Sequence, residues 1–246
     1  MKILMKLTWV DLKISLRNWI TTFFTLVFPV LMLFLFGSMY GNKPTPMLGG
    51  YGSMDVTVPG YIVAMVIGTT GMISLPLELT ARRQQGVLRR FRATPLSPAA
   101  VLISHFAVNL VMSLIGTALL IIGGVLAYKI VLPPHPIQAA LGFLLVSLSV
   151  YAMGFVIASL VHSVNAARAI TMAIFYPMMF LCGGTIPLVF LPAAVKAIAR
   201  WLPLTYGVNL FRDLWFGNGW DLTAIGILSV ILFLCALISI RFFKWE

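Results

Sequence analysis

The stretch LELTARRQQGVLRRFRATPLSPAA, residues 77–100, carries five arginines between two long apolar runs. Only 9% of the 246 residues are charged, so this is a strong local concentration of charge. The flanking segments 56–77 and 93–128 contain no Asp, Glu, Lys or Arg. Positive charge between two uncharged runs is typical of a short loop at a membrane surface. The arginines are Arg82, Arg83, Arg89, Arg90 and Arg92.

The composition extends this interpretation to the whole chain. Hydrophobic residues make up 61% of the sequence and the mean hydropathy is +1.03, whereas about 25% of the residues of a soluble domain are charged. Each uncharged segment can hold the roughly 20 residues of a spanning helix. We therefore predict an all-α membrane protein of one domain, residues 1–246, with six transmembrane helices. The uncharged segments are 18–42, 56–77, 93–128, 130–167, 169–195 and 222–240.

Two helix boundaries follow from local signals. Ser97 and Pro98 are a capping hydroxyl and a proline suited to the first helical position, so the third helix is predicted to begin there. The fourth uncharged segment opens with PPHP at residues 133–136. Proline breaks helices, so the fourth helix is predicted to run from about Ile137 to Val161.

The lysines and arginines predict the orientation. An even number of crossings places both termini on one side, and that side carries 12 of the 17 basic residues. The side richer in Lys and Arg is the cytoplasmic one. Most of the formal net charge of +11 is then explained by topology, and nucleic-acid binding is not needed to account for it.

Two further segments are predicted to lie at the membrane without crossing it. In residues 1–17 the basic residues share one helical stripe with apolar neighbours on both sides, which is typical of an interfacial helix that binds lipid phosphates. Residues 185–216 are cut into short apolar pieces by Pro187, Pro192 and Pro203. We expect a re-entrant hairpin followed by an amphipathic piece, packed against the helices because broken backbone at depth must be sheltered.

The arginine-rich loop carries more than charge. Val87, Leu88 and Phe91 have helical spacing, so a short helix over 82–92 would present a small apolar knob surrounded by arginines. A loop that only anchors the topology would explain the charge but not the knob. A docking helix for an acidic, grooved cytoplasmic partner explains both features.

Two motifs resemble one family. The run RRQQGVLRRFRATPLSPAAVL, residues 82–102, is similar to the intracellular loop of type-2 ABC transporter permeases. The run CGGTIPLVFLPAAVKAIARWLPLTYGVNLFRDL, residues 182–214, is similar to the end of the family's fifth helix and the segment that follows it. The resemblance implies a homodimeric permease that works with two copies of a separate ATP-binding cassette ATPase and exports its substrate.

The resemblance also assigns the energy source to the partner. This sequence has no G-x-x-x-x-G-K-[ST] phosphate loop, so ATP and Mg are expected on the ATPase, and no cofactor, metal or catalytic activity is expected in this chain. The residues expected to couple the chain to the ATPase are Arg82, Arg83, Gly86, Leu88, Arg89 and Phe91.

One departure from the family pattern concerns a carboxylate. The family usually has an acidic residue just before the loop glycine, whereas this sequence has Gln84 and Gln85 there. Glu78 is the nearby carboxylate that remains. It is either a relay of movement from the loop to the second helix, or an intrahelical partner of Arg82 four residues later.

By resemblance, the substrate path is expected between two permeases, lined by the first, second and fifth helices. These helices offer aromatic and thioether side chains and no charge in their interior, which favours a hydrophobic or amphipathic substrate such as a drug, antibiotic, peptide or lipid. Gly183 and Gly184 are the expected outer gate. The expected path residues are Phe28, Met72, Phe175, Tyr176 and Met179.

Other functions remain as alternatives. A secondary transporter would favour carboxylates buried in the spans, and an intramembrane enzyme would need a nucleophile with a base or a cluster of His, Asp and Glu. A non-transporting membrane component of an ATPase complex, for sensing or immunity, also fits the sequence. The expected location is the plasma membrane, as a bacterial or archaeal inner-membrane protein with both termini in the cytoplasm.

Overall fold

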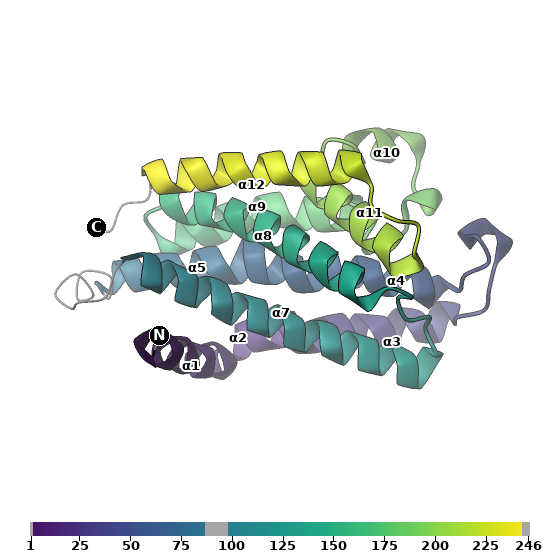
Figure 1. Cartoon of the computed structure of the whole chain (residues 1–246), viewed down its shortest axis with the longest axis horizontal. Coiled ribbons are helices and arrows are strands. Elements are labelled where there is room, and N and C mark those ends of the chain that lie inside the picture. Colours follow the sequence, from purple (N-terminus) through teal and green to yellow (C-terminus); the bar gives the residue numbers. More distant parts are fainter. Residues whose placement is uncertain (1, 87–97, 243–246) are drawn as a thin grey trace.

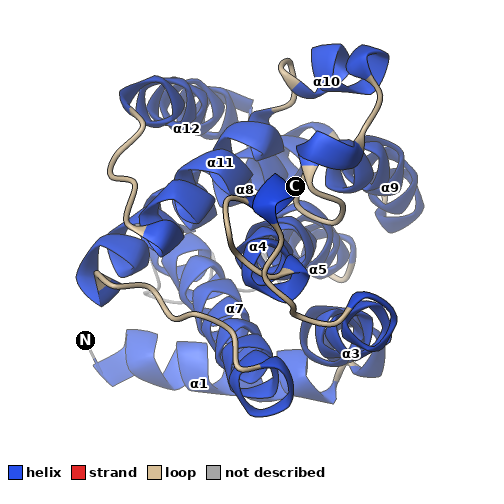
Figure 2. Ribbon diagram, turned by 90° about the vertical axis from the view of Figure 1, so that its right-hand side faces the viewer, coloured by secondary structure: helices blue, strands red, loops and turns tan. Residues whose placement is uncertain are grey.

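The computed structural model describes residues 2–86 and 98–242, and its regular elements there are all helical. Six helices are long and apolar enough to cross a membrane, which confirms the predicted fold class. They lie side by side as a bundle (Figures 1 and 2). The six are Phe23–Tyr40, Pro46–Gln84, Ile103–Tyr128, Pro136–Leu160, Val164–Leu181 and Leu222–Phe242.

The first and the second span each contain wide π-helical turns. The first span comprises α2 (Trp19–Thr22), the π segment η1 (Phe23–Val27) and α3 (Phe28–Tyr40). The second comprises α4 (Ser53–Tyr61), the π segments η3 (Ile62–Ile67) and η4 (Thr69–Ser74), and α5 (Leu75–Gln84).

Proline gives a physical reason for two of these wide turns. Pro29 lies two residues after η1, and Pro76 lies two residues after η4. Proline has no N–H to donate and its ring clashes with the carbonyl four residues earlier, so the preceding turn widens. At the start of η4, the hydroxyls of Thr69 and Thr70 donate to the carbonyls of Met65 and Val66 in the preceding turn.

The remaining spans are regular helices. They are α7 (Pro98–Tyr128), α8 (Pro136–Leu160), α9 (Val164–Leu181) and α12 (Leu222–Phe242). The predicted start of the third helix at Pro98 is confirmed, and the predicted bounds of the fourth agree to within one residue. Pro177 lies inside α9 without interrupting it.

Short helices complete the chain. α1 (Lys2–Arg17) lies across one end of the bundle (Figure 2). The 3₁₀ turn η2 (Pro46–Leu48) follows the first span. Between α9 and α12 lie the 3₁₀ turn η5 (Leu188–Phe190), α10 (Ala193–Ala199) and α11 (Pro203–Phe216), and α11 buries one face against the spans.

The two ends of the bundle carry different elements. α1 and the C-terminal ends of α5 and α12 lie at one end, left in Figure 1, and α10 lies toward the other. Following the predicted orientation, we call these the inner and the outer end. Residues 82–84 form the last turn of α5, and the chain turns at Gly86, where φ is +68°. The predicted helix over 82–92 therefore does not begin at Arg82, and residues 87–92 lie outside the described residues.

The second span forms the centre of the core. It is surrounded by the other helices (Figure 2), and its residues from Met54 to Met72 are buried. Glycines permit the closest approaches: a Cβ on Gly60 would lie 2.3 Å from the carbonyl oxygen of Gly184, and one on Gly154 would lie 1.9 Å from that of Gly71. Small residues at helix contacts are the usual means of close packing in membranes.

Candidate functional site

A polar cluster joins α1 to the spans at the inner end. Asp11 of α1 is only 3% exposed. One of its carboxylate oxygens accepts from Nη1 of Arg82 in α5 at 2.9 Å, and the other accepts from the Ser104 hydroxyl in α7 at 3.1 Å. α1 is therefore attached to the second and third spans through a buried carboxylate.

Glu78 lies next to this cluster. Its Oε1 accepts a long bond of 3.4 Å from the Ser15 hydroxyl, and its Oε2 lies 3.9 Å from Nδ1 of His105. Arg82 forms its ion pair with Asp11, so the intrahelical Glu78–Arg82 pair is not formed. Among the described residues, the carboxylate of Glu78 thus has only these two distant partners.

The predicted coupling residues divide into two groups. Arg82 is held by Asp11, and the buried Arg83 donates to the carbonyl of Val161 in the turn between α8 and α9. Gly86 forms the turn after α5. Leu88, Arg89 and Phe91 lie outside the described residues. The two described arginines are therefore attached to neighbouring elements.

A cavity of about 510 Å³, here called the inner cavity, lies between the first, second and fifth spans. Phe28, Tyr176 and Met179 line it, as expected for path residues, whereas Met72 and Phe175 are buried in the core. Phe175 packs on Gly68, where an added Cβ would lie 2.5 Å from its ring.

The inner cavity has a polar and an apolar end. Glu78 and Arg168 line it together with apolar side chains of the first, second and fifth spans. A smaller polar pocket of about 340 Å³, lined by Asp11, Ser15 and Arg82, shares Asn18, Glu78 and Ala81 with it. Glu78 therefore lies at the junction of the inner cavity and the polar cluster.

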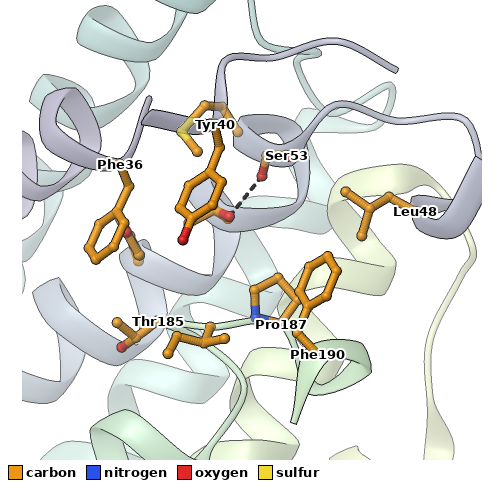
Figure 3. Close-up of a pocket in the computed structure, with 11 residues that line it drawn as sticks. Phe36, Tyr40, Leu48, Ser53, Thr185, Pro187 and Phe190 are labelled. Carbon is orange, nitrogen blue, oxygen red and sulfur yellow. Dashed lines mark hydrogen bonds between the residues drawn. The ribbon is translucent and has the colours of Figure 1, made fainter. Parts of the chain in front are cut away.

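A second apolar cavity of about 410 Å³, the outer cavity, lies at the outer end. Figure 3 shows Phe36 and Tyr40 of α3 facing Thr185, Pro187 and Phe190 of the segment after α9. Tyr61 also lines this cavity, and its buried hydroxyl has no hydrogen-bond partner. The two cavities lie along the same pair of spans, one toward each end.

The predicted gate glycines lie in a tightly packed turn. Gly183 has a φ of +79°, a conformation that favours glycine, and its carbonyl accepts from Nη2 of Arg212 at 2.9 Å. Gly184 contacts Gly60 and Ala64 of the second span. In this conformation the turn connects the end of α9 to both α11 and the second span.

Comparison with known proteins identifies the family. The sequence profile described as ABC-2 type transporter matches residues 3–216. The chain belongs to the ABC-2 type transporter family. This confirms the resemblance seen in residues 82–102 and 182–214.

Named relatives of this ABC-2 chain are permeases or a nodulation protein. The putative transport permease ycf38 of Cyanophora paradoxa is 26% identical over 224 residues, covering 89% of this chain and 74% of the relative. The protein of the same name in Porphyra purpurea is 24% identical over 197 residues, covering 79% and 67%. Nodulation protein J of Rhizobium leguminosarum bv. viciae is 28% identical over 200 residues, covering 77% and 73%. Together with the six apolar helices, the family indicates a multi-pass membrane permease.

Two buried carboxylates of this permease, Asp11 and Asp55, were not predicted from the sequence. Asp55 is 5% exposed and accepts from the backbone N–H groups of Gly52 and Val131 and from the amide of Asn42. The Asn42 amide also donates to the Tyr128 carbonyl, which connects the outer ends of the first three spans. The available signal was Asp55 at the third position of α4, from which its carboxylate accepts the backbone N–H of the N-cap residue Gly52.

A buried hydroxyl network joins three spans of the permease. The hydroxyl of Tyr151 in α8 lies 2.7 Å from the Ser113 hydroxyl and 3.3 Å from that of Thr70, and it also donates to the Asn109 carbonyl at 3.0 Å. Buried polar groups in a membrane need such partners. The side-chain amide of Asn109 donates to the His105 carbonyl within α7.

Proposed function

We propose that the chain is the permease subunit of an ABC exporter, and that a separate ATPase drives outward movement of a hydrophobic or amphipathic substrate. The observation that carries the proposal is the inner cavity between the first, second and fifth spans, which lies beside the polar cluster at the base of the arginine-rich segment. Family membership supports the general role of an ABC transporter permease.

The proposed energy source is two copies of an ATP-binding cassette ATPase, which bind ATP and Mg and act on a permease homodimer. Leu88 and Phe91 would insert into a groove of the ATPase. Arg82 is bound to α1 through Asp11, and Arg83 is bound to the α8–α9 turn. A displacement of the segment after α5 would therefore move α1 and this turn together with α5, and Glu78 would relay it toward the inner cavity.

The proposed path runs from the inner cavity to the outer cavity along the second span. Apolar linings at both ends suit a hydrophobic or amphipathic substrate. Gly183 and Gly184 lie where the segment after α9 contacts Gly60, so opening would separate this contact. The proposed location is the plasma membrane, with both termini in the cytoplasm and lipid around α1.

Reconstitution tests this function. The permease and the cassette ATPase that co-purifies with it are placed in liposomes, and ATP-dependent movement of a fluorescent amphiphile is measured. We expect transport that needs both proteins, and we expect the double substitution Leu88→Asp and Phe91→Asp to abolish both co-purification and transport.

Trp201→Asp is the matched control, because Trp201 is an 87% exposed apolar residue between α10 and α11. This variant should retain the ATPase and transport. Transport without any ATPase would contradict the proposal and favour a secondary transporter. ATP hydrolysis by an intact complex that moves no cargo would instead support the non-transporting, sensing role.

A further inference from the structure

Two opposite charges, the half-buried Glu78 and the exposed Arg168, line the inner cavity without pairing with each other. Glu78 comes from α5 and Arg168 from the second turn of α9. No ion pair within 4.0 Å joins these two described residues. No described residue accepts a hydrogen bond from the Arg168 guanidinium, and the Glu78 carboxylate has only the contacts of 3.4 and 3.9 Å described above.

The rest of the lining is mainly apolar, with Asn18, Thr69 and Ser74 as further polar residues, and it contains one buried hydroxyl without a hydrogen-bond partner among the described residues. Phe24, Phe28, Met172 and Tyr176 contribute aromatic and thioether surface. Thr25 also lines the cavity; it is 1% exposed, and its hydroxyl has no hydrogen-bond partner. This lining suits the apolar chain of an amphiphile.

The charged residues occupy one end of the inner cavity. Asn18, Ala81 and Glu78 are shared with the polar pocket at the inner end, whereas Thr25, Phe28 and Met179 lie farther along their spans. A molecule in this cavity would have its head group at the membrane surface and its apolar part between the spans, which is how an amphiphile lies in a lipid leaflet.

We propose that the inner cavity binds a zwitterionic amphiphile, with its cationic group on Glu78, its anionic group on Arg168 and its apolar part along the first, second and fifth spans. This inference rests on the proposed function, because it takes the inner cavity to be where cargo is received. A purely cationic molecule would leave Arg168 without a partner, and a purely anionic one would leave Glu78 without a partner. A phosphate oxygen would accept a charge-assisted hydrogen bond from Arg168, and Coulombic attraction would hold the cationic group near Glu78, so the two contacts would fix the orientation of the head group.

Photolabelling of the purified permease in nanodiscs tests the proposal without any ATPase. Four probes share a dodecyl chain with a diazirine near its end and differ in the head group: phosphocholine, trimethylammonium, sulfate or maltoside. We expect the phosphocholine probe to label the helices of the first, second and fifth spans most strongly, by about tenfold over maltoside, the ratio expected for one charge-assisted hydrogen bond to Arg168. This ranking is read in the unmodified chain and needs no variant.

Two substitutions then test which charge of the head group contacts which residue of the cavity. Glu78→Gln should reduce labelling by the phosphocholine and trimethylammonium probes about tenfold and leave the maltoside probe unchanged. Arg168→Gln should weaken the phosphocholine and sulfate probes but not the trimethylammonium probe. Arg241→Gln is the matched control, because Arg241 is exposed at the end of α12 and should change none of the four.

The outcomes separate this inference from the proposed function. Equal labelling by all four head groups, or labelling outside the three helices, would overturn the inference even if the reconstituted complex exports an uncharged dye. The expected ranking in a complex that exports nothing would support the binding site and contradict the export function. If phosphatidylethanolamine in the nanodisc suppresses labelling, the occupant is a membrane lipid; if it does not, the occupant is a soluble zwitterionic amphiphile.

Discussion

At the scale of single residues, Asp55 shows how one side chain can hold several helices. It accepts from two backbone N–H groups and from Asn42, and so connects the loop before α4, the end of the first span and the turn after α7. A carboxylate supplies only acceptors, which suits a place where every neighbour is a donor.

Asp55→Asn is therefore expected to destabilise the permease by about 1–3 kcal/mol, because its amide nitrogen would face a donor and leave one buried N–H without an acceptor. The thermal unfolding midpoint in detergent measures this loss. Asp213→Asn serves as the control, because Asp213 accepts from the amide of Asn218 at an exposed site. Equal midpoints for the two variants would contradict the role given to Asp55.

Sequence reasoning found the residues of the inner cavity better than it found the buried carboxylates. Phe28, Tyr176 and Met179 could be placed because spanning helices have a regular period and the resemblance named the helices. Asp11 and Asp55 lie next to charged or turn residues and look solvated in the sequence. Their burial depends on segments more than 60 residues away, α7 for Asp11 and the turn after α7 for Asp55, and local patterns do not contain this information.

At the scale of helices, contacts between glycines set the spacing of the second span. Gly60→Ala would place a Cβ 2.3 Å from the Gly184 carbonyl oxygen, and backbone atoms cannot move aside as a side chain can. We expect a loss of about 1–3 kcal/mol in the free energy of unfolding. Gly226→Ala in α12 is the control, because nothing lies within 4 Å of its added Cβ. A Gly60→Ala variant as stable as Gly226→Ala would show that the two segments can separate freely.

The attachment of α1 can be measured by a double-mutant cycle. Asp11→Asn and Arg82→Gln each break the ion pair between α1 and α5, so their effects on the free energy of unfolding should not add. We expect a coupling energy of roughly 0.5–3 kcal/mol, the usual range for residues in contact. Arg17→Gln combined with Asp11→Asn is the control pair, because Arg17 is exposed on α1, and it should give additive effects. Additivity in the Asp11–Arg82 pair would mean that α1 is held by other contacts.

Helix boundaries were predicted well where sequence signals act locally. Pro98 and the PPHP turn mark the starts of α7 and α8 because proline acts on its own turn. The π segments were not predicted, since prolines at 29, 76 and 177 look alike in the sequence. Two of them follow wide turns, whereas the third lies inside regular α9. Packing around each helix decides between these outcomes.

At the scale of the whole molecule, orientation is the prediction with the widest consequences. The even number of spans places α1 and the end of α12 at one end of the bundle, with the end of α5 beside them (Figure 1). The excess of basic residues predicts that this end faces the cytoplasm. The cavity assignments and the ATPase contact depend on this orientation.

Cysteine labelling of intact cells checks it. In a background where Cys182 and Cys235 are replaced by alanine, Asn218→Cys should react with a membrane-impermeant maleimide, because residue 218 is exposed at the turn before α12. Gln85→Cys, exposed after α5, should react only after permeabilisation. The reverse pattern would place the arginine-rich segment outside the cell and exclude an ATPase contact there.

The two π segments of the second span have a mechanical consequence. Each wide turn holds an extra residue, and such an insertion can migrate along a helix one residue at a time while most backbone hydrogen bonds stay formed. Each migration step turns the side chains it passes by about 100°. Such a helix can change which of its side chains face the two cavities by twisting locally. Its ends stay in place and its length hardly changes.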